Sequence, residues 1–256
     1  MTSGVRNAGR LVGMLAVATL ALQLFFLLRI GLMTVVAPES TTFQRSEIWR
    51  IVLEKHQLPW LQDSVARDRI SDNLRRAVIA SEDAGFVEHH GVEWDAVEKA
   101  WSKNEKAQAR AEAQQSRAAT RRGRDGKPRE IAAKVVGGST ISQQLAKNLF
   151  LSGERNILRK GQELVITFML EFVLGKDCIL TTYLNNVEWG EGVFGAQAAS
   201  EHYFRTNAAT LGPAQAARLA VMLPAPKRFE KSPSSPYVLG RSSTIVARMG
   251  GVDLPN

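Results

Sequence analysis

The sequence predicts a mainly α-helical protein, in which a helical domain follows one N-terminal transmembrane helix. An uncharged apolar run of eighteen residues lies near the N-terminus, at 11–28. Apolar residues recur at helical spacing in several later segments, whereas alternating runs of β-branched residues are few. Of the 256 residues, 45% are apolar and 23% are charged, and these ordinary globular values exclude wholesale disorder.

The apolar run at 11–28 is long enough to cross a membrane. As a helix it extends about 27 Å, close to the hydrocarbon thickness of about 30 Å. Further apolar residues follow, so we expect a transmembrane anchor at 11–37. Arg6 and Arg10 precede it, and the positive-inside tendency then places residues 1–10 in the cytoplasm. The remaining domain, 38–256, is expected on the periplasmic side of a bacterial inner membrane, as in a single-pass protein.

Two other interpretations of this run are a cleaved signal peptide and a buried core helix. A cleaved signal peptide would have a shorter apolar core and a small-x-small cleavage site, which Val35 and Ala37 imitate only weakly before Pro38. A helix buried in a soluble core would normally show a polar face. An uncleaved anchor therefore explains the pattern best.

Positive charge is concentrated in one segment. The chain has 33 basic and 25 acidic residues, a net charge of +8. Residues 102–136 contain ten basic and four acidic residues, so +6 lies there and only +2 elsewhere. This distribution excludes a nucleic-acid-binding protein coated with charge. Residues 103–120 could form a solvated helix and 121–129 a flexible turn. Two interpretations of the insert stay open: a solvent-exposed excursion, or a mobile flap that attracts an anionic ligand such as a diphosphate.

Cysteine and histidine usage excludes two further classes of site. Cys178 is the one cysteine, so the chain has no internal disulfide framework and no multi-cysteine metal site. The four histidines show no HExxH or similar paired spacing on a helix, so we do not expect a dedicated zinc site.

Helical spacing in the exported domain predicts helices at 74–81, 94–101, 141–151, 157–174 and 214–223. The first of these runs into Glu82 and Asp83, followed by Phe86 and His89. Acids at a helix C-terminus oppose the helix dipole by a few tenths to about 1 kcal/mol. Local rules broken in this way tend to mark function, although a terminal acidic pair is also common on surfaces.

The second polar block surrounds the start of the helix at 141–151. Gly137 and Gly138 permit a close backbone approach, and Ser139 is a natural N-cap. One face of the following helix carries hydroxyl, amide and ammonium groups, from Thr140, Gln144, Lys147 and Asn148, opposite an apolar stripe. An ordinary amphipathic helix would explain the spacing, but not the choice of these polar side chains.

The third block is Arg159, Lys160 and Glu163, on one turn of the helix at 157–174. From residue 164 onward this helix is apolar nearly all round, with Glu171 as its one charge, so we expect it to be central and buried. A carboxylate beside two cations suggests an anion-handling site, and structural ion pairing is an equally good explanation. A fourth block, from Ile179 to Asn185 and the glycines that follow, looks like scaffold on its own.

Together, these blocks resemble the peptidoglycan glycosyltransferases, in particular their monofunctional membrane-anchored members. The resemblance covers residues 60 to 240. It rests on five motifs in order: Glu82-Asp83-x-x-Phe86-x-x-His89-x-Gly91; Gly138-Ser139-Thr140-Ile141-x-Gln143-Gln144-x-x-Lys147-Asn148; Arg159-Lys160-x-x-Glu163; Tyr183-Leu184-Asn185-x4-Gly190-x4-Gly195; and Leu223-Pro224-x-Pro226 with Ser232-Pro233. Any one motif could arise by chance, but five in order are specific.

The resemblance implies a lysozyme-like, bilobal helical fold and polymerisation of lipid II through β-1,4 bonds with release of undecaprenyl diphosphate. It implies that Glu82 is the general base and that Glu163 lies near the diphosphate, which Lys147, Arg159 and Lys160 neutralise. Further roles implied are substrate orientation by Thr140, Gln144 and Asn148, and support of the first loop by Asp83, Phe86 and His89. Some members of the family use a divalent cation at the diphosphate, so the resemblance implies a non-essential Mg²⁺ or Mn²⁺ near Glu163 and no organic cofactor. The partners it implies are lipid II, the growing glycan strand, the membrane and cell-wall synthesis or division proteins.

The chain departs from the family at Thr181, where many members have Glu, so no acid is expected to act there. The chain ends at Asn256 without room for a transpeptidase domain, and cross-linking is not expected. Two alternatives to a polymerase were weighed: a catalytically silent scaffold for cell-wall assembly, and a glycan-cleaving enzyme with the same fold. The polymerase hypothesis predicts that Glu82 and Glu163, on separate helices, face one groove just above the lipid.

Overall fold

A computed structural model describes residues 3–119, 138–151 and 156–255 of the chain. The chain forms two compact units. The main unit comprises residues 1–91 and 141–256, and the second unit comprises Val92–Thr140. Each unit is described by itself.

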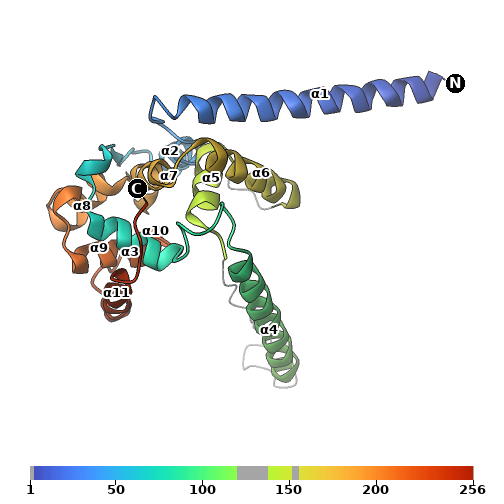
Figure 1. The fold of residues 1–256 in the computed structure, drawn as a ribbon. Coiled ribbons are helices and arrows are strands. Elements are labelled where there is room, and N and C mark those ends of the chain that lie inside the picture. The colour runs from blue at the N-terminus through green and yellow to red at the C-terminus, as the bar shows by residue number, and fades with distance from the viewer. Residues whose placement is uncertain (1–2, 120–137, 152–155, 256) are drawn as a thin grey trace. The chain divides into compact units, whose positions relative to one another are not determined.

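The main unit is built almost entirely from helices (Figure 1). Its N-terminal half contains α1 (Ser3–Leu32), α2 (Thr42–Lys55), the 3-10 turn η1 (Arg67–Arg69), α3 (Asp72–Glu82), α5 (Ile141–Phe150), α6 (Ile157–Val173) and α7 (Lys176–Asn186). Its C-terminal part contains α8 (Ala196–Phe204), the 3-10 turn η2 (Ala208–Thr210), α9 (Pro213–Met222), α10 (Pro226–Phe229) and α11 (Pro236–Met249). The predicted mainly α-helical class is therefore confirmed.

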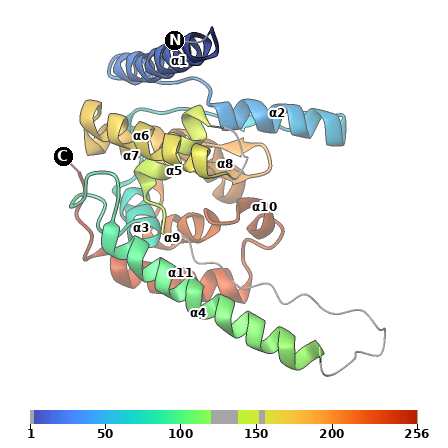
Figure 2. The same cartoon turned by 90° about the vertical axis from the view of Figure 1, so that its right-hand side faces the viewer.

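Two helical layers position the candidate site. In one layer α3 packs against α9 and α11, and in the other α5 packs against α2, α6 and α7 (Figure 2). The apolar stripes that the sequence shows on α3 and α5 are buried, including Leu74, Val78, Ile141 and Leu145. The helices predicted at 74–81, 141–151, 157–174 and 214–223 correspond to α3, α5, α6 and α9.

A small three-stranded sheet completes the main unit. It consists of β1 (Leu61–Gln62), β2 (Glu188–Gly190) and β3 (Val193–Phe194) in the order β1-β3-β2. β1 pairs with β3 in parallel, Leu61 opposite Val193, and β2 pairs with β3 antiparallel. Strands this short cannot be predicted from alternating hydrophobicity, because at least four residues are needed to show the alternation.

The N-terminal helix has the length and composition of a membrane span over Asn7–Leu32. Only 6% of its most apolar window is buried, which contradicts the alternative of a core helix. Its C-terminal half nevertheless contacts the rest of the main unit, where Phe26 and Ile30 are buried and Phe26 meets the ring of Phe150 edge-on. Gln23 and Gln162 of α6 exchange two amide hydrogen bonds, of 2.8 and 3.0 Å.

Helix α6 corrects one expectation from the sequence. An all-round apolar helix is expected to be buried on every side, yet Val165, Phe168 and Phe172 are exposed, Phe172 by 89%. These residues lie on one face at i, i+3 and i+7, while Ile166 and Leu170 on the opposite face are fully buried. Hydropathy alone cannot distinguish a helix covered by protein from one with a face left for lipid, because both surroundings are apolar.

The second unit consists of α4 (Trp94–Ala119) and the segment that leads to Thr140. α4 contains the predicted helix at 94–101 and continues through 103–119, as expected for a solvated helix. Gly138 lies against α4, since a Cβ there would come within 3.2 Å of the Ala96 carbonyl oxygen. This contact confirms the close approach predicted for that glycine, whereas the turn predicted at 121–129 lies outside the described residues.

Candidate active site

Glu82 is the last residue of α3, and its carboxylate lies against α5. The Gln144 side chain donates a hydrogen bond to Glu82 Oε2 at 3.0 Å, and the Ser81 hydroxyl lies 3.4 Å from Oε1. Burial raises the pKa of Glu82, and the neighbouring carboxylate of Asp83 raises it further, against the hydrogen bonds and the positive charge of Lys147. A carboxylate with a raised pKa is suited to accept a proton near neutral pH.

Asp83 follows directly and is almost completely buried. Its Oδ2 accepts the backbone N–H of Ile141 at 2.9 Å, the first residue of α5, and its Oδ1 lies 2.8 Å from His89 Nε2. Ser139 is the N-cap predicted for this helix from the sequence. Because α5 begins only at Ile141, Ser139 lies one position too early, and an acid from another helix binds the first N–H group instead.

The loop after α3 orients the His89 ring. The backbone N–H of Gly91 donates to His89 Nδ1 at 3.1 Å, so this nitrogen is an acceptor and the ring proton resides on Nε2, facing Asp83. Phe86 is fully buried and meets the His89 ring edge-on. Asp83, Phe86 and His89 thus hold one another in the first loop.

Gly91 joins this loop to α6. Its φ is +89°, and a Cβ there would come within 2.8 Å of Thr167 Cγ2 and 3.0 Å of Glu171 Cγ. Only glycine satisfies both the positive φ and this close approach. The Gly91 backbone therefore sets the spacing between the loop that follows Glu82 and the helix that carries Glu163.

Glu171 connects three helices, although the sequence alone predicts no role for it. The Ser142 hydroxyl of α5 donates to Glu171 Oε1 at 2.5 Å, and Lys176 Nζ of α7 lies 2.8 Å from the same oxygen. Lys176 also lies over the Phe86 ring, 4.5 Å from its centre. The signal for Glu171 is visible in the sequence as the one charge in an apolar helix, whereas nothing in the sequence identifies its partners.

Glu163 is buried on α6 between two cations of the same helix. Arg159 Nη1 lies 3.1 Å from Glu163 Oε2, and Lys160 Nζ lies 2.5 Å from Oε1. The predicted cluster of one acid and two cations therefore exists as a set of ion pairs. The Lys160 side chain is half exposed, so its ammonium group is accessible to an anionic ligand from solvent.

The remaining predicted residues lie on α5 or just before it. Gln144 contacts Glu82 directly, Lys147 lies near enough to influence its pKa, and Asn148 is buried one turn further along. Thr140 belongs to the second unit rather than to the main unit that holds Glu82. Since α5 packs on α6, one helix connects the surroundings of Glu82 with the helix that carries Glu163.

Tyr183 of α7 is hydrogen-bonded to Gln144, the residue that contacts Glu82. Its side chain is fully buried, and its hydroxyl donates a hydrogen bond to Gln144 Oε1 at 2.9 Å. The fourth sequence block, interpreted as scaffold, thus reaches the candidate base through a single amide.

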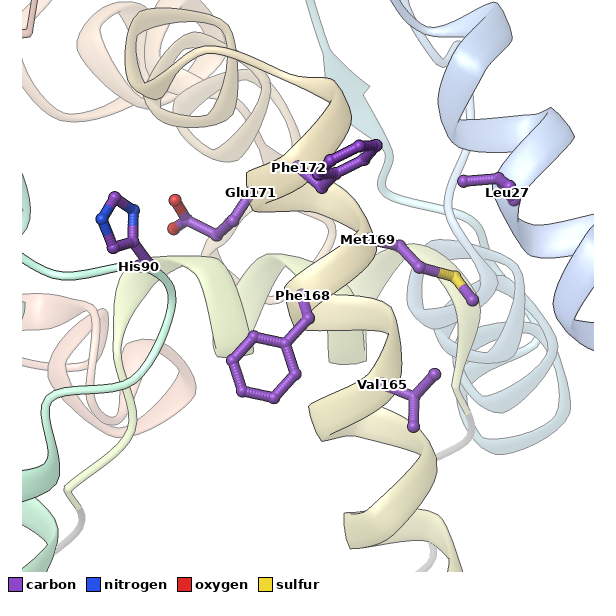
Figure 3. Close-up of a pocket in the computed structure, with 7 residues that line it drawn as sticks. All are labelled: Leu27, His90, Val165, Phe168, Met169, Glu171 and Phe172. Atoms are coloured by element: carbon purple, nitrogen blue, oxygen red, sulfur yellow. The ribbon is translucent and has the colours of Figure 1, made fainter.

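A groove of about 680 Å³ opens between α1 and α6 (Figure 3). Its apolar lining comes from Leu27 of α1 and from α6, namely Val165, Phe168, Met169 and Phe172. Figure 3 shows the Glu171 carboxylate directed toward His90 at one end of this groove. An apolar groove with one wall formed by a candidate membrane span is suited to hydrocarbon rather than to water.

The family resemblance implies a divalent cation near Glu163, at the diphosphate of the substrate. In the part of the chain that the structure describes, no three His, Cys, Asp or Glu side chains gather into a metal-binding group. Both oxygens of Glu163 are engaged by Arg159 and Lys160, whose cations place positive charge beside this carboxylate.

Two segments of the chain, residues 53–116 and 117–250, match the family described as Transglycosylase. Three similar proteins carry the name biosynthetic peptidoglycan transglycosylase. That of Cupriavidus metallidurans is 49% identical and covers 96% of this chain and 97% of its own length. That of Cupriavidus pinatubonensis is 47% identical, and the match covers 99% of this chain and 93% of the relative. That of Paraburkholderia xenovorans is 46% identical, and the match covers 94% of this chain and 90% of the relative.

Proposed function

Because the chain belongs to the transglycosylase family, we propose that this enzyme of peptidoglycan synthesis polymerises lipid II into linear glycan strands. The acceptor's 4-hydroxyl attacks the anomeric carbon of the donor sugar, and a β-1,4 bond forms. The bond between that carbon and the diphosphate oxygen breaks, and undecaprenyl diphosphate leaves with the bonding electron pair. The hydroxyl proton passes to a general base.

The environment of Glu82 is the single observation that carries this proposal. Its carboxylate ends α3, is partly buried, and has a raised pKa, as a base that works near neutral pH requires. Gln144 donates to Oε2, and Oε1 has the Ser81 hydroxyl at 3.4 Å, so a second lone pair of Oε1 can accept a hydrogen bond from the acceptor hydroxyl. In this proposal Glu82 takes the proton as the glycosidic bond forms.

Charge neutralisation at the leaving group is the second part of the proposal. Departure of a diphosphate builds negative charge, and fixed cations aimed at that charge stabilise the transition state. Arg159 and Lys160 are the cations beside Glu163, and Lys147 lies on the neighbouring α5. We assign the diphosphate to these side chains, with Glu163 holding Arg159 and Lys160 in place.

The membrane helix supports a lipid-linked substrate. An enzyme tethered beside a lipid-anchored substrate meets it at a high effective concentration. The groove between α1 and the exposed face of α6 opens beside this helix. We propose that residues 1–10 are cytoplasmic and that the catalytic part acts on the periplasmic side, where Glu82 and Glu163 face one groove above the lipid.

Incubation of the purified protein with labelled lipid II in detergent, followed by sizing of the products, tests this function. A polymerase converts the precursor into long glycan strands, which a muramidase then shortens. A glycan-cleaving enzyme instead shortens finished peptidoglycan and leaves the lipid-linked precursor intact. A silent scaffold changes neither the lipid-linked precursor nor finished peptidoglycan. Cleavage of finished peptidoglycan with the precursor intact, or no reaction at all, would overturn the proposal.

A further inference from the structure

Gln144 can face Glu82 in two ways, with opposite consequences for the carboxyl group. An amide turned with its N–H toward a carboxylate stabilises the charged form, whereas an amide turned with its oxygen toward it stabilises the protonated form. The two orientations occupy the same space, so packing alone does not select between them. A second hydrogen bond, made by the Gln144 amide on the side away from Glu82, selects between the two orientations.

Tyr183 provides that bond. Its hydroxyl donates to Gln144 Oε1 at 2.9 Å while Gln144 Nε2 donates to Glu82 Oε2 at 3.0 Å. A turned amide would place its N–H₂ group against the Tyr183 hydroxyl and its oxygen against Glu82. The hydroxyl would then have to accept rather than donate, and a charged Glu82 would meet a carbonyl oxygen.

The Tyr183 hydroxyl keeps the proton that it donates to Gln144. Its side chain is fully buried on α7, and burial together with the carboxylates of Glu82 and Asp83 raises its pKa well above the usual value. It therefore keeps its proton throughout the range in which the enzyme can work. The hydrogen bond from Tyr183 therefore holds the Gln144 amide, and with it the N–H group that faces the Glu82 carboxylate, at every pH in this range.

We propose that Tyr183 is a positioning residue for glycosyl transfer: its hydroxyl fixes the Gln144 amide so that the N–H group faces Glu82 and keeps this residue ready to accept a proton. The inference rests on the base role proposed for Glu82. It assigns to the fourth sequence block a part in the reaction, although Tyr183 itself touches neither substrate nor reacting atoms.

Other groups around Glu82 set the baseline for the test. Asp83 on the same chain segment raises its pKa, Lys147 on α5 lowers it, and the Ser81 hydroxyl lies within hydrogen-bond distance. His89 pairs with Asp83 rather than with Glu82. None of these contacts involves the Tyr183 hydroxyl, so we expect a shift in the titration of Glu82 on its removal to report on Gln144.

The test compares Tyr183→Phe with Tyr203→Phe. Tyr203 is also largely covered and donates its hydroxyl to the Trp189 backbone oxygen at 2.9 Å, away from Glu82, so it controls for loss of a buried hydroxyl. In Tyr183→Phe we expect the acidic limb of the kcat–pH profile to move upward by roughly one pH unit, the size of one exchanged hydrogen bond. The rate should return toward the wild-type rate at alkaline pH, and Tyr203→Phe should leave the limb in place.

A second readout does not depend on activity. The pH dependence of the thermal unfolding midpoint should differ between wild type and Tyr183→Phe, and this difference should vanish when both carry Glu82→Gln. If the wild-type protein fails to polymerise lipid II, the proposed function is wrong, while this measurement still tests the contact. Loss of rate without movement of the limb, and without a Glu82-dependent change in unfolding, would overturn the role of Tyr183.

Gln144→Met keeps the inference testable if Tyr183→Phe alone does not fold. Replacing both polar partners, as in Tyr183→Phe with Gln144→Met, removes the amide oxygen that Tyr183→Phe alone would leave without its donor. Glu82 loses the Gln144 hydrogen bond equally in Gln144→Met and in the double variant, so these two are compared with each other. If Tyr183 acts only through Gln144, the double variant has its acidic limb where Gln144→Met alone places it. A further shift in the double variant would contradict the inference.

Discussion

Asp83 Oδ2 accepts the backbone N–H of Ile141 at 2.9 Å, which joins the C-terminal end of α3 to the N-terminal end of α5. An acid at the negative end of a helix is unfavourable, but the same charge is favourable at the positive end of another helix. The contact explains why an acidic pair can end α3, and it holds Glu82 beside the helix that carries Gln144.

Removing the Asp83 carboxylate tests this junction. Asp83→Ala loses the bond to Ile141 and the bond to His89, so the free energy of unfolding should fall by about 2–3 kcal/mol. Chemical denaturation in detergent measures the change. The exposed Asp68→Ala is the control, and an equally small loss in both variants would show that Asp83 does not hold the two helices together.

Gly91 should not tolerate a side chain. Gly91→Ala adds a Cβ within 2.8 Å of Thr167 Cγ2 at a positive φ, so we expect a loss of about 1–3 kcal/mol in unfolding free energy. Thr167→Ser in the same chain removes the clashing methyl group and should recover part of this loss. Gly161→Ala on α6 meets open space and should be neutral or stabilising. Thermal unfolding of the three variants checks this, and equal midpoints would contradict it.

Glu188 should make stability decrease as the pH rises. Burial raises its pKa from 4.5 to about 7, against the attraction of Lys227, while Glu47 adds to the increase. Between these two values the folded state binds more protons than the unfolded state, so the free energy of unfolding falls with rising pH, by at most about 3 kcal/mol.

Glu188→Gln removes this proton and should therefore flatten the decrease between about pH 5 and pH 8. Denaturation curves across this range measure the slope, with the exposed Glu105→Gln as a control for the substitution itself. A wild-type stability that rises through this range, or a Glu188→Gln slope equal to that of wild type, would show that the carboxyl group is not held protonated.

Removal of divalent cations should leave polymerisation largely intact. Arg159 and Lys160 engage both oxygens of Glu163, and the described residues form no metal-binding group, so side chains provide the positive charge. The assay compares rates on lipid II with and without a chelator. Loss of activity that Mg²⁺ or Mn²⁺ restores would contradict this and favour the cation that the family resemblance implies.

The helices could be predicted because their apolar spacing is a local property. α3, α5, α6 and α9 appear within one or two residues of the predicted ranges, since burial of one face imposes a period of 3.6 residues. α6 shows where this fails: its apolar character was visible in the sequence, but its exposed face was not. Hydropathy gives the polarity of the surroundings without identifying them.

Contacts between helices could not be predicted from spacing. Nothing local in Tyr183 indicates that α7 places its hydroxyl on Gln144, and nothing in Ser139 indicates that Asp83 replaces it at the start of α5. The ion pairs of Glu163 were predictable because all three residues lie on one turn. Contacts between residues one turn apart can be predicted from helix geometry. Contacts between separate helices depend on how the helices pack, which the local sequence does not show.

The rate at which Glu82→Gln polymerises lipid II tests the central claim most directly. The substitution keeps the shape of the side chain but removes the group that accepts the proton, and we expect a loss of at least about 100-fold in kcat. Glu188→Gln also removes a buried carboxylate with a raised pKa, and it should retain a rate close to wild type. A folded Glu82→Gln variant that polymerises as fast as Glu188→Gln would show that Glu82 is not the base.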